Sequence, residues 1–443
     1  MDFGSIPFIL WFLPAFLIGY YIFTSEQWRK FWIIAATVIF YGISCGMWTA
    51  ALLAMTAAAI LGAYSVKEKG KPALAVFILL FLGILIYTKI SGNFMPGVSF
   101  LVFTMLSMLI YIYRNKEVQY HFSDLAAYIL FFPKLLSGPI AQIGDMPDHY
   151  VTTVANRKDA ILRRIENGLI YFIIGLGYKV LLANQLSGLW REVQTIGIPS
   201  ISTPLAWMGI LAFTLQLYFD FQGYSLMAIG IGRMIGVYLP ENFDLPYLSR
   251  SVSEFYRRWH MTLGRWFREY VYFPMGGSKK GLPQTILNLL AVWLLTGLWH
   301  GIGPSFLLWG LFLFFWIALE KIFLKRFLTG FFGHIYVWLL LPMSWVFFAL
   351  DDLADIKWFF LRLFAPILGN SGINVSAGDY LKYGSMYWPF LLIGICLLFI
   401  APEKWMRQRR DKWYVILLLT VIFWGSVYLL AQGVNNPFMY FSF

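Results

Sequence analysis

The sequence predicts an all-α, polytopic integral membrane protein. Sixty per cent of its 443 residues are hydrophobic and only 13% are charged. The mean hydropathy of +0.68 is far above that of a soluble domain. The apolar residues gather in runs close to the roughly 20 residues that a helix needs to cross a bilayer. We therefore expect about ten to twelve spans, with additional re-entrant and interfacial helices, in one transmembrane domain over residues 1–443.

The candidate spans are the apolar runs of suitable length. The first is expected to be a retained span and not a cleavable signal, because Asp2 is acidic and no Lys or Arg precedes Arg29. Gly or Pro interrupts several runs, which makes these runs candidates for tilted or re-entrant helices. The runs are residues 5–24, 31–44, 46–66, 73–90, 98–113, 123–138, 167–183, 204–220, 221–238, 284–302, 304–324, 335–350, 387–402 and 413–431.

Most of the net charge of +12 is explained by the positive-inside rule, which places basic loops in the cytosol. No basic motif resembles a nucleic-acid-binding motif. We therefore expect the protein to interact with the lipid bilayer and not with a nucleic acid. The acidic segment 351–355 and the polar segment 369–380 are expected outside. The basic loops expected in the cytosol are 67–71, 113–116, 156–164, 276–281, 321–326 and 403–413.

The sequence predicts neither a disulfide framework nor a metal site. The chain has two distant cysteines, Cys45 and Cys396, which cannot form a disulfide framework. No spacing of His, Cys, Asp or Glu is typical of a metal site. We therefore expect neither a metal nor a bound cofactor.

Asp220 is an ionisable residue in the middle of an apolar run, "LYFDFQGYSLMAIGIG" at 217–232. Such a residue is expensive inside a membrane and usually has a role. One interpretation is a structural ion pair with a neighbouring arginine. The other is that Asp220 orients a neighbouring group or binds substrate.

The segment 251–274 predicts an amphipathic helix at the cytosolic interface. Ser251 and Glu254 have the spacing of a capping box, so the helix should begin there. His260 falls on the apolar arc, near its edge, and should face the protein body as either a hydrogen-bonded core residue or a catalytic one. One arc holds Phe255, Tyr256, Trp259, Leu263, Trp266, Phe267 and Tyr270, and the other holds Arg257, Arg258, Arg265 and Arg268.

His300 lies among glycines in "TGLWHGIG" at 296–303, a segment that ends directly before Pro304. These residues predict a tight break between two spans. Such a break is tolerated at membrane depth only where it is buried in protein or lines a water-filled cavity. His300 could therefore reach substrate, or it could be a helix-capping or interfacial histidine. The remaining histidines, His121, His149 and His334, are expected at the surface.

Taken together, residues 218–281 and 295–310 resemble the bacterial branch of the membrane-bound O-acyltransferase (MBOAT) family. The likeness is greatest to the membrane subunits of alginate and peptidoglycan O-acetyltransferases. It depends on "RRWH" ending at His260, "GLWHG" around His300 and the "GGSK" loop between them. Further segments that fit are 97–114, 131–140, 175–184 and 435–443.

The resemblance implies a ring-like helical bundle with a thin centre that opens to both sides. It implies transfer of an acyl group, most often acetyl, from a cytosolic thioester such as acetyl-CoA to a hydroxyl on the other side. His300 matches the catalytic histidine of the family and His260 its second signature histidine. Trp299, Asp220 and the basic Arg257 and Arg258 are expected to bind substrate, with Arg265, Lys279 and Lys280 also attracting the phosphates of the donor.

The same resemblance implies the partners and the location. The expected acceptor is a cell-surface polysaccharide, or a separate extracytoplasmic protein with a serine-hydrolase-like fold that modifies it. The expected location is the bacterial cytoplasmic (inner) membrane. Two alternatives stay open: transfer of D-alanine from a carrier protein towards teichoic acid, and a polytopic transporter or flippase, which would more often show inverted repeats.

Overall fold

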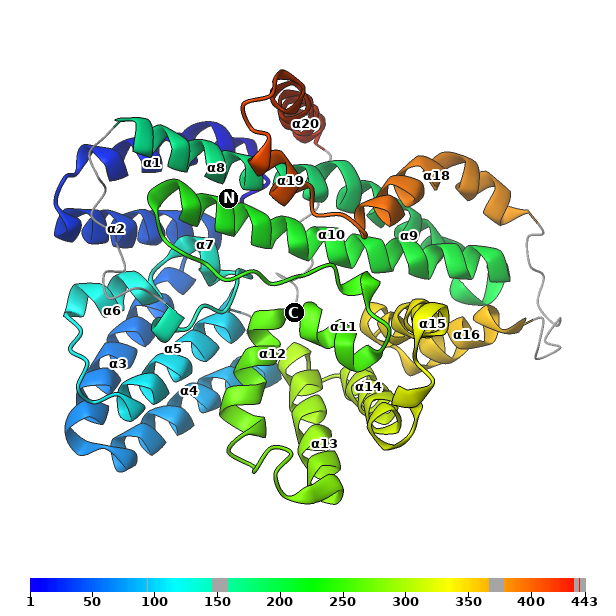
Figure 1. Cartoon of the computed structure of the whole chain (residues 1–443), viewed down its shortest axis with the longest axis horizontal. Helices are drawn as coiled ribbons and strands as arrows, with labels where there is room; N and C mark the ends of the chain where they lie inside the picture. Colours follow the sequence, from blue (N-terminus) through cyan, green and yellow to red (C-terminus); the bar gives the residue numbers. More distant parts are fainter. Residues whose placement is uncertain (94, 146–157, 366–377, 434–437, 439–443) are drawn as a thin grey trace. The chain divides into compact units, whose positions relative to one another are not determined.

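In a computed structural model the described residues are 1–93, 95–145, 158–365, 378–433 and 438, and the regular structure among them is entirely helical (Figure 1). The chain divides into two compact units, which are described separately. The predictions for His149 and for most of 369–380 and 435–443 concern residues outside the described ranges.

The first unit contains residues 1–177, 223–241 and 403–442. It also holds the second part of a long helix, α10 (Thr203–Ile235). Its other helices are η1 (Phe8–Phe12), α1 (Leu13–Ile22), α2 (Glu26–Cys45), α3 (Trp48–Lys69), α4 (Lys71–Ser91), α5 (Val98–Arg114), α6 (Phe122–Ile129), α7 (Phe132–Leu135), η2 (Ile143–Asp145), α8 (Lys158–Gly177), α19 (Pro402–Gln408) and α20 (Trp413–Ala431).

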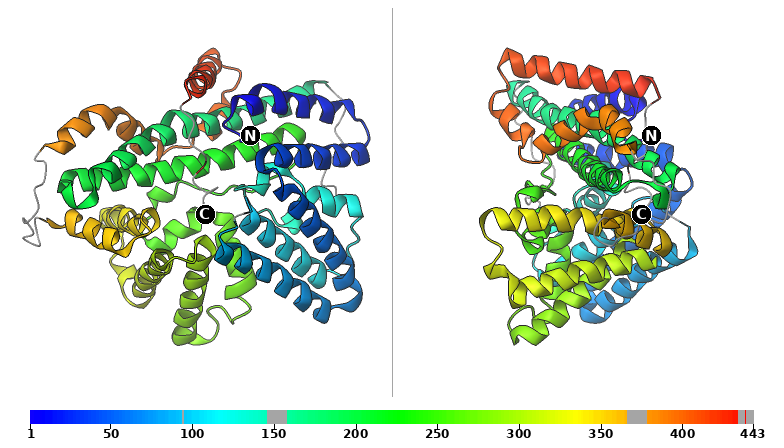
Figure 2. Two further views of the ribbon diagram at one scale, coloured as in Figure 1. Left: turned by 180° about the vertical axis from the view of Figure 1, so that it is seen from behind. Right: turned by 90° about the vertical axis from the view of Figure 1, so that its right-hand side faces the viewer.

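Small residues let the helices of this unit approach closely, as is usual in membranes. Helices α3, α4 and α5 run alongside one another (Figure 2), and a Cβ on Gly62 of α3 would lie 2.9 Å from the ring of Phe77. A Cβ on Gly168 of α8 would lie 2.4 Å from the carbonyl oxygen of Gly230 in α10. Gly168 therefore places α8 and α10 in backbone contact, and Gly62 leaves room for the Phe77 ring between α3 and α4.

The predicted span 123–138 is wrong as a single helix, because the chain breaks between α6 and α7. The hydroxyl of Thr37 accepts a hydrogen bond from the Phe132 N–H at 3.1 Å and donates one to the Leu130 carbonyl at 3.0 Å. The break is therefore buried with its main chain satisfied, which is the condition for irregular backbone inside a membrane protein.

The second unit contains residues 178–222 and 242–402. It holds the first part of α10 and the segments around both histidines. Its other helices are η3 (Tyr178–Ala183), α9 (Asn184–Ile196), η4 (Ile198–Ser200), η5 (Pro246–Leu248), α11 (Val252–Arg258), α12 (Met261–Phe267), η6 (Arg268–Tyr272), α13 (Gly281–His300), α14 (Pro304–Ile322), η7 (Leu324–Arg326), α15 (Gly330–Ala349), α16 (Leu353–Leu363) and α18 (Asp379–Leu397).

The predicted division between spans 204–220 and 221–238 is also wrong, because α10 is one helix of 33 residues. The glycines of this run allowed either close packing or a break in the helix, and the structure shows no break at Asp220, since a polar side chain with a buried partner does not end a helix. Asp220 has such a partner in Lys179. Gly223 lowers helix propensity by only about 1 kcal/mol, and a Cβ on Gly175 of α8 would lie 2.5 Å from its carbonyl oxygen, so α8 packs closely against it.

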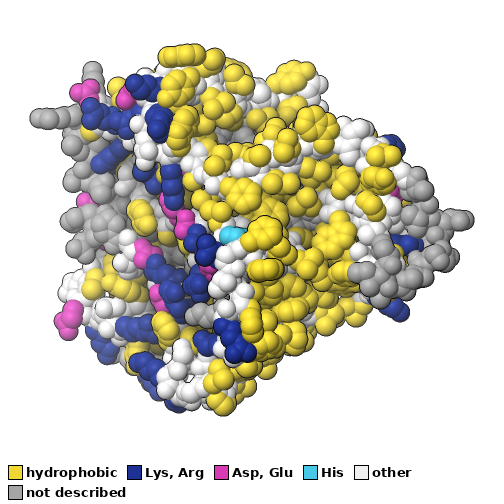
Figure 3. Space-filling view, turned by 45° about the vertical axis from the view of Figure 1, so that its right-hand side comes forward, with side chains coloured by type: hydrophobic (Ala, Val, Ile, Leu, Met, Phe, Trp, Pro, Cys, Tyr) yellow, Lys and Arg dark blue, Asp and Glu magenta, His cyan; other side chains and the backbone are white. Residues whose placement is uncertain are grey.

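The described helices confirm an all-α, polytopic membrane protein. Eight are long and apolar enough to cross a membrane, and α18 and α19 together form a ninth candidate with a break. Two shorter apolar helices, Phe8–Ile22 and Val98–Arg114, add to these. Hydrophobic side chains cover much of the surface drawn in Figure 3, as expected where lipid replaces water.

Candidate active site

The predicted helix 251–274 is broken at His260, so the expectation of one continuous amphipathic helix is wrong. His260 has φ 45° and ψ 51°, in the left-handed region, and it separates α11 from α12. This conformation costs a non-glycine residue roughly 1–2 kcal/mol. The periodicity of the aromatic residues continues through the break, which is why the sequence pattern does not reveal it. The segment forms two short helices that meet at a sharp bend, and residues 252–272 are here called the His260 hairpin.

Asn242 holds the tip of the His260 hairpin in this strained conformation. Its carbonyl accepts from the Met261 N–H at 2.9 Å, and its side-chain oxygen accepts from the Thr262 hydroxyl at 2.6 Å. The Asp244 N–H donates to the Arg258 carbonyl at 3.0 Å. Hydrogen bonds on both sides of His260 therefore offset the strain, a pattern common at functional sites.

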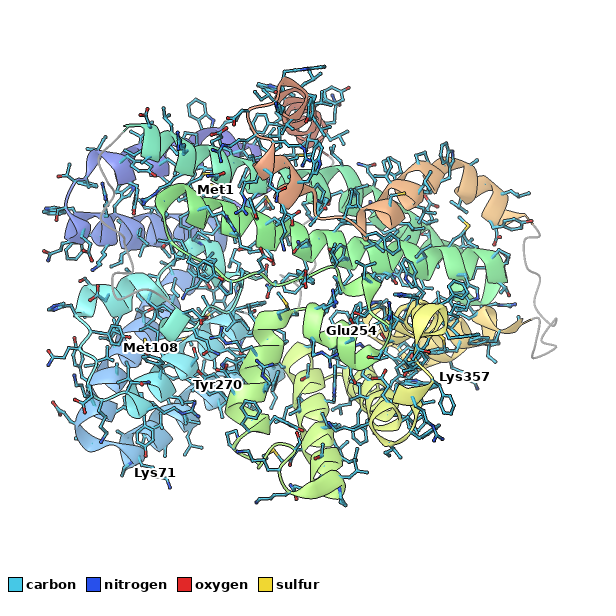
Figure 4. The ribbon with its side chains drawn as sticks, viewed as in Figure 1. Met1, Lys71, Met108, Glu254, Tyr270 and Lys357 are labelled. Atoms are coloured by element: carbon cyan, nitrogen blue, oxygen red, sulfur yellow. The ribbon has the colours of Figure 1, made fainter. Side chains whose placement is uncertain are left out.

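The start of the hairpin is as predicted. The Ser251 hydroxyl accepts a hydrogen bond from the Glu254 N–H at 3.0 Å, which confirms Ser251 as the helix cap. Figure 4 labels Glu254 on α11 and Tyr270 near the other end of the hairpin. At that end Asn288 of α13 donates to the carbonyls of Met275 and Gly277, at 3.4 and 2.9 Å. The loop that follows the hairpin is thus fixed to α13.

His300 is the last residue of α13, and the predicted break follows it. Gly301 is extended and Pro304 is the first residue of α14. A Cβ on Gly297 would lie 2.5 Å from the carbonyl oxygen of Phe306, and a Cβ on Gly310 would lie 2.5 Å from that of Trp293. The glycines therefore bring α13 and α14 into backbone contact on either side of the break.

The imidazole of His300 is enclosed by aromatic rings. The side chain is 5% exposed. Its ring centre lies 4.8 Å from that of Trp299, 5.2 Å from that of Trp309 and 5.0 Å from that of Phe348, and each pair is close to perpendicular. His300 is therefore not an exposed interfacial residue. It lies in a low-dielectric environment, where electrostatic interactions with a reacting group are strong.

His260 meets the same aromatic group from the hairpin. It is 3% exposed, as predicted for a residue that faces the protein body. Its ring lies 4.7 Å from Phe221 and 6.0 Å from Trp299. Burial lowers the pKa of His260 to about 3. Two signature segments that are 40 positions apart thus meet at the indole of Trp299.

The comparisons decide the family. Residues 33–349 match the membrane-bound O-acyltransferase family, MBOAT. The chain belongs to this family. It is therefore a membrane O-acyltransferase, and the alternative of a transporter or flippase is set aside.

Individual relatives agree with this assignment. The probable alginate O-acetylase AlgI of Pseudomonas putida is 33% identical, with 100% of both chains covered. The peptidoglycan O-acetyltransferase of Helicobacter pylori is 28% identical over 100% of this chain and 97% of its own. The teichoic acid D-alanyltransferase of Bacillus subtilis is 31% identical over 49% of this chain and 56% of its own.

The basic residues of this membrane O-acyltransferase fall into two groups. Arg258 forms an ion pair with Glu254 at 3.1 Å, and Arg265 forms one with Glu269 at 3.1 Å. A second group is exposed and has no ion pair with any described residue: Arg257, Arg268, Lys279 and Lys280. The second group is the better candidate for attracting an anionic substrate.

Asp220 forms a buried ion pair with Lys179 at 2.5 Å, both side chains being 2% exposed. The partner is thus a lysine and not the arginine that the structural interpretation suggested. Asp220 directly precedes Phe221, whose ring contacts His260. The assignment of Asp220, Arg257, Arg258 and Trp299 to substrate binding stays a prediction.

Three residues at this site escaped the sequence analysis. Lys179 was visible only as a lone cation in the apolar run 167–183. Glu320, whose carboxylate accepts hydrogen bonds from the Val252 and Ser253 N–H groups, was visible only as a lone carboxylate at the end of the run 304–324. No local pattern in the sequence pointed to Asn242, because it binds residues about 20 positions further along the chain, Met261 and Thr262. Within the described ranges, no group of three or more His, Cys, Asp or Glu could hold a metal ion.

Proposed function

We propose that this O-acyltransferase moves an acetyl group from a cytosolic thioester, such as acetyl-CoA, to a hydroxyl of an extracytoplasmic cell-surface polysaccharide or of a serine-hydrolase-like partner protein that modifies it. The proposed location is the bacterial cytoplasmic membrane. The observation that carries the proposal is the enclosure of His300 beside a backbone break. The alginate O-acetylase and peptidoglycan O-acetyltransferase relatives support acetyl as the group and a polysaccharide as the acceptor.

In the proposed reaction His300 is the general base. A neutral imidazole takes the proton of the acceptor hydroxyl while the oxygen attacks the thioester carbonyl. The bond between carbon and sulfur then breaks, and the proton passes from His300 to the departing thiolate. The products are an ester and a free thiol. The rings of Trp299, Trp309 and Phe348 exclude water, which would otherwise compete as the nucleophile.

The remaining site residues would bind and orient. His260 would complete the site from the hairpin side of Trp299. Arg257, Lys279 and Lys280 would attract the phosphates of the donor, because they are exposed and free of ion pairs with described residues. Arg258 would stabilise the His260 hairpin more than it would bind the donor, since it already forms an ion pair with Glu254.

The test is ester-linked acetate on the cell-surface polymer. A deletion strain would be complemented with wild type, with His300→Ala and with His334→Ala, at matched membrane abundance. His334 is a half-exposed histidine of the same unit and serves as the matched control. We expect acetate with wild type and His334→Ala and a loss of at least about 100-fold with His300→Ala. Equal acetylation by all three proteins would overturn the assigned role of His300.

A second candidate is D-alanyl transfer towards teichoic acid, which the Bacillus subtilis relative favours. It ranks second because that likeness covers about half of the chain. The released polymer distinguishes the two, since mild base liberates acetate in one case and D-alanine in the other. The partner is tested in the same strain: acetylated polymer without any second acetylation protein would exclude the partner.

A further inference from the structure

The carboxylate of Glu320 is bound by the main chain of the His260 hairpin. Glu320 lies in the last turn of α14 and is 3% exposed. One of its oxygens accepts from the Val252 N–H at 2.6 Å, and the other accepts from the Ser253 N–H at 2.9 Å. Hydrogen bonds to an ionised carboxylate are roughly twice as strong as neutral ones. A carboxylate buried in an apolar helix is expensive, so this arrangement calls for a functional explanation.

These two bonds fix the point at which α11 begins. The first N–H groups of a helix have no acceptor within it. Here Val252 and Ser253 donate to Glu320, and Glu254 donates to Ser251. Because α11 has only seven residues, it is too short to be stable by itself. Its position therefore depends on the contacts at its start.

Glu320 shares its helix with a residue that lies against His300. Trp309 precedes Glu320 by three turns, about 16 Å along α14. The Trp309 ring lies 5.2 Å from that of His300 and 6.3 Å from that of Tyr256 in α11. Tyr256 in turn precedes His260 by about one turn. Helix α14 thus contacts α11 at its start and again one turn before the hairpin tip.

We propose that Glu320 is a positioning residue for acyl transfer: its carboxylate sets the register of α11 so that His260 lies against Trp299. This inference rests on the proposed function, because it assigns Glu320 to the same site. A shift of α11 by one residue would rotate its side chains by about 100°. Such a shift would remove Tyr256 from Trp309 and His260 from Trp299.

The decisive variant is Glu320→Gln, which keeps the shape but turns an NH₂ group towards a main-chain N–H. We expect acetyl transfer per folded molecule to fall about ten-fold or more, with the donor KM changed less than about two-fold. Val252→Pro removes the N–H that one oxygen accepts, and proline is tolerated at the first helical position. Adding Val252→Pro to Glu320→Gln should therefore restore part of the activity. Ser253→Ala keeps the main-chain N–H and should match wild type.

Hydrogen exchange over residues 252–260 gives a readout that needs no acyl donor. Glu320→Gln should speed exchange there, and Ser253→Ala should not. Unchanged exchange in Glu320→Gln overturns the inference whether or not the protein transfers acetyl. Wild-type turnover by Glu320→Gln, or losses that simply add in the double variant, would also overturn it. If Glu320→Gln shows the faster exchange but the wild-type protein transfers no acetyl group, the proposed function is overturned and the role of Glu320 in placing α11 is not.

Discussion

The ring of His260 lies 6.0 Å from that of Trp299, the residue that directly precedes His300. Trp299 contacts His300 at 4.8 Å, so one indole lies in ring contact with both imidazoles. The break at His260 lies at this contact, since His260 is the residue that separates α11 from α12. The relationship also means that a change at either histidine can be transmitted to the other through this shared aromatic contact.

The stability of the protein should depend on pH through His260. Burial lowers the pKa of His260 to about 3, from an ordinary value near 6.5. Between these values the unfolded chain binds a proton that the folded chain does not, so this contribution is complete above about pH 6.5 and is lost as the pH falls towards 3. The limiting slope is about 1.4 kcal/mol for each pH unit. The measurement is the free energy of unfolding of the detergent-solubilised protein between pH 7 and 5. It should change less with pH in His260→Gln than in wild type. The same pH dependence in both proteins would contradict the prediction.

The left-handed conformation of His260 predicts an unusual order of stability among its variants. Glycine adopts φ 45° without strain, whereas alanine does not. We therefore expect His260→Gly to be about 1 kcal/mol more stable than His260→Ala, the reverse of the order in an ordinary helix. Thermal unfolding of the two variants side by side is the measurement. A more stable alanine variant would mean that the tip relaxes into another conformation.

The ion pair between Lys179 and Asp220 predicts strong non-additivity. Asp220→Asn leaves a buried ammonium without its counter-charge, which should destabilise the protein by about 3–5 kcal/mol. Lys179→Met combined with Asp220→Leu removes both charges and should restore most of the membrane yield. Folded protein after detergent extraction is the readout for the single variants and the pair. Additive losses would show that the two charges act separately.

The exposed cations predict a salt-dependent donor affinity. Arg257→Gln, Lys279→Gln and Lys280→Gln should each raise the donor KM about two- to five-fold, with little change in kcat. The effect should shrink at high ionic strength, because salt screens exposed charges. Arg265→Gln is the matched control, since Glu269 already pairs with that arginine. An equal rise in KM for the control would mean that the donor does not distinguish the two groups of cations.

The sequence predicted those features that depend on composition and local pattern. Apolar runs predicted the membrane helices, and the glycines with Pro304 predicted the break after His300. The cap at Ser251 was also predictable, because it involves residues three positions apart. The errors have a common origin: whether a helix continues at Gln222 or breaks at His260 depends on tertiary partners. Lys179 and Asn242 are distant in sequence from the residues they stabilise, so no local pattern reveals them.

The glycine contacts between α13 and α14 have a consequence for how substrates enter. Gly297 and Gly310 bring main chain against main chain, with no space for even a methyl group. At the level of these two contacts no acyl chain or sugar can pass between α13 and α14. A substrate that reaches His300 must therefore pass beside this contact of α13 with α14 and not through it.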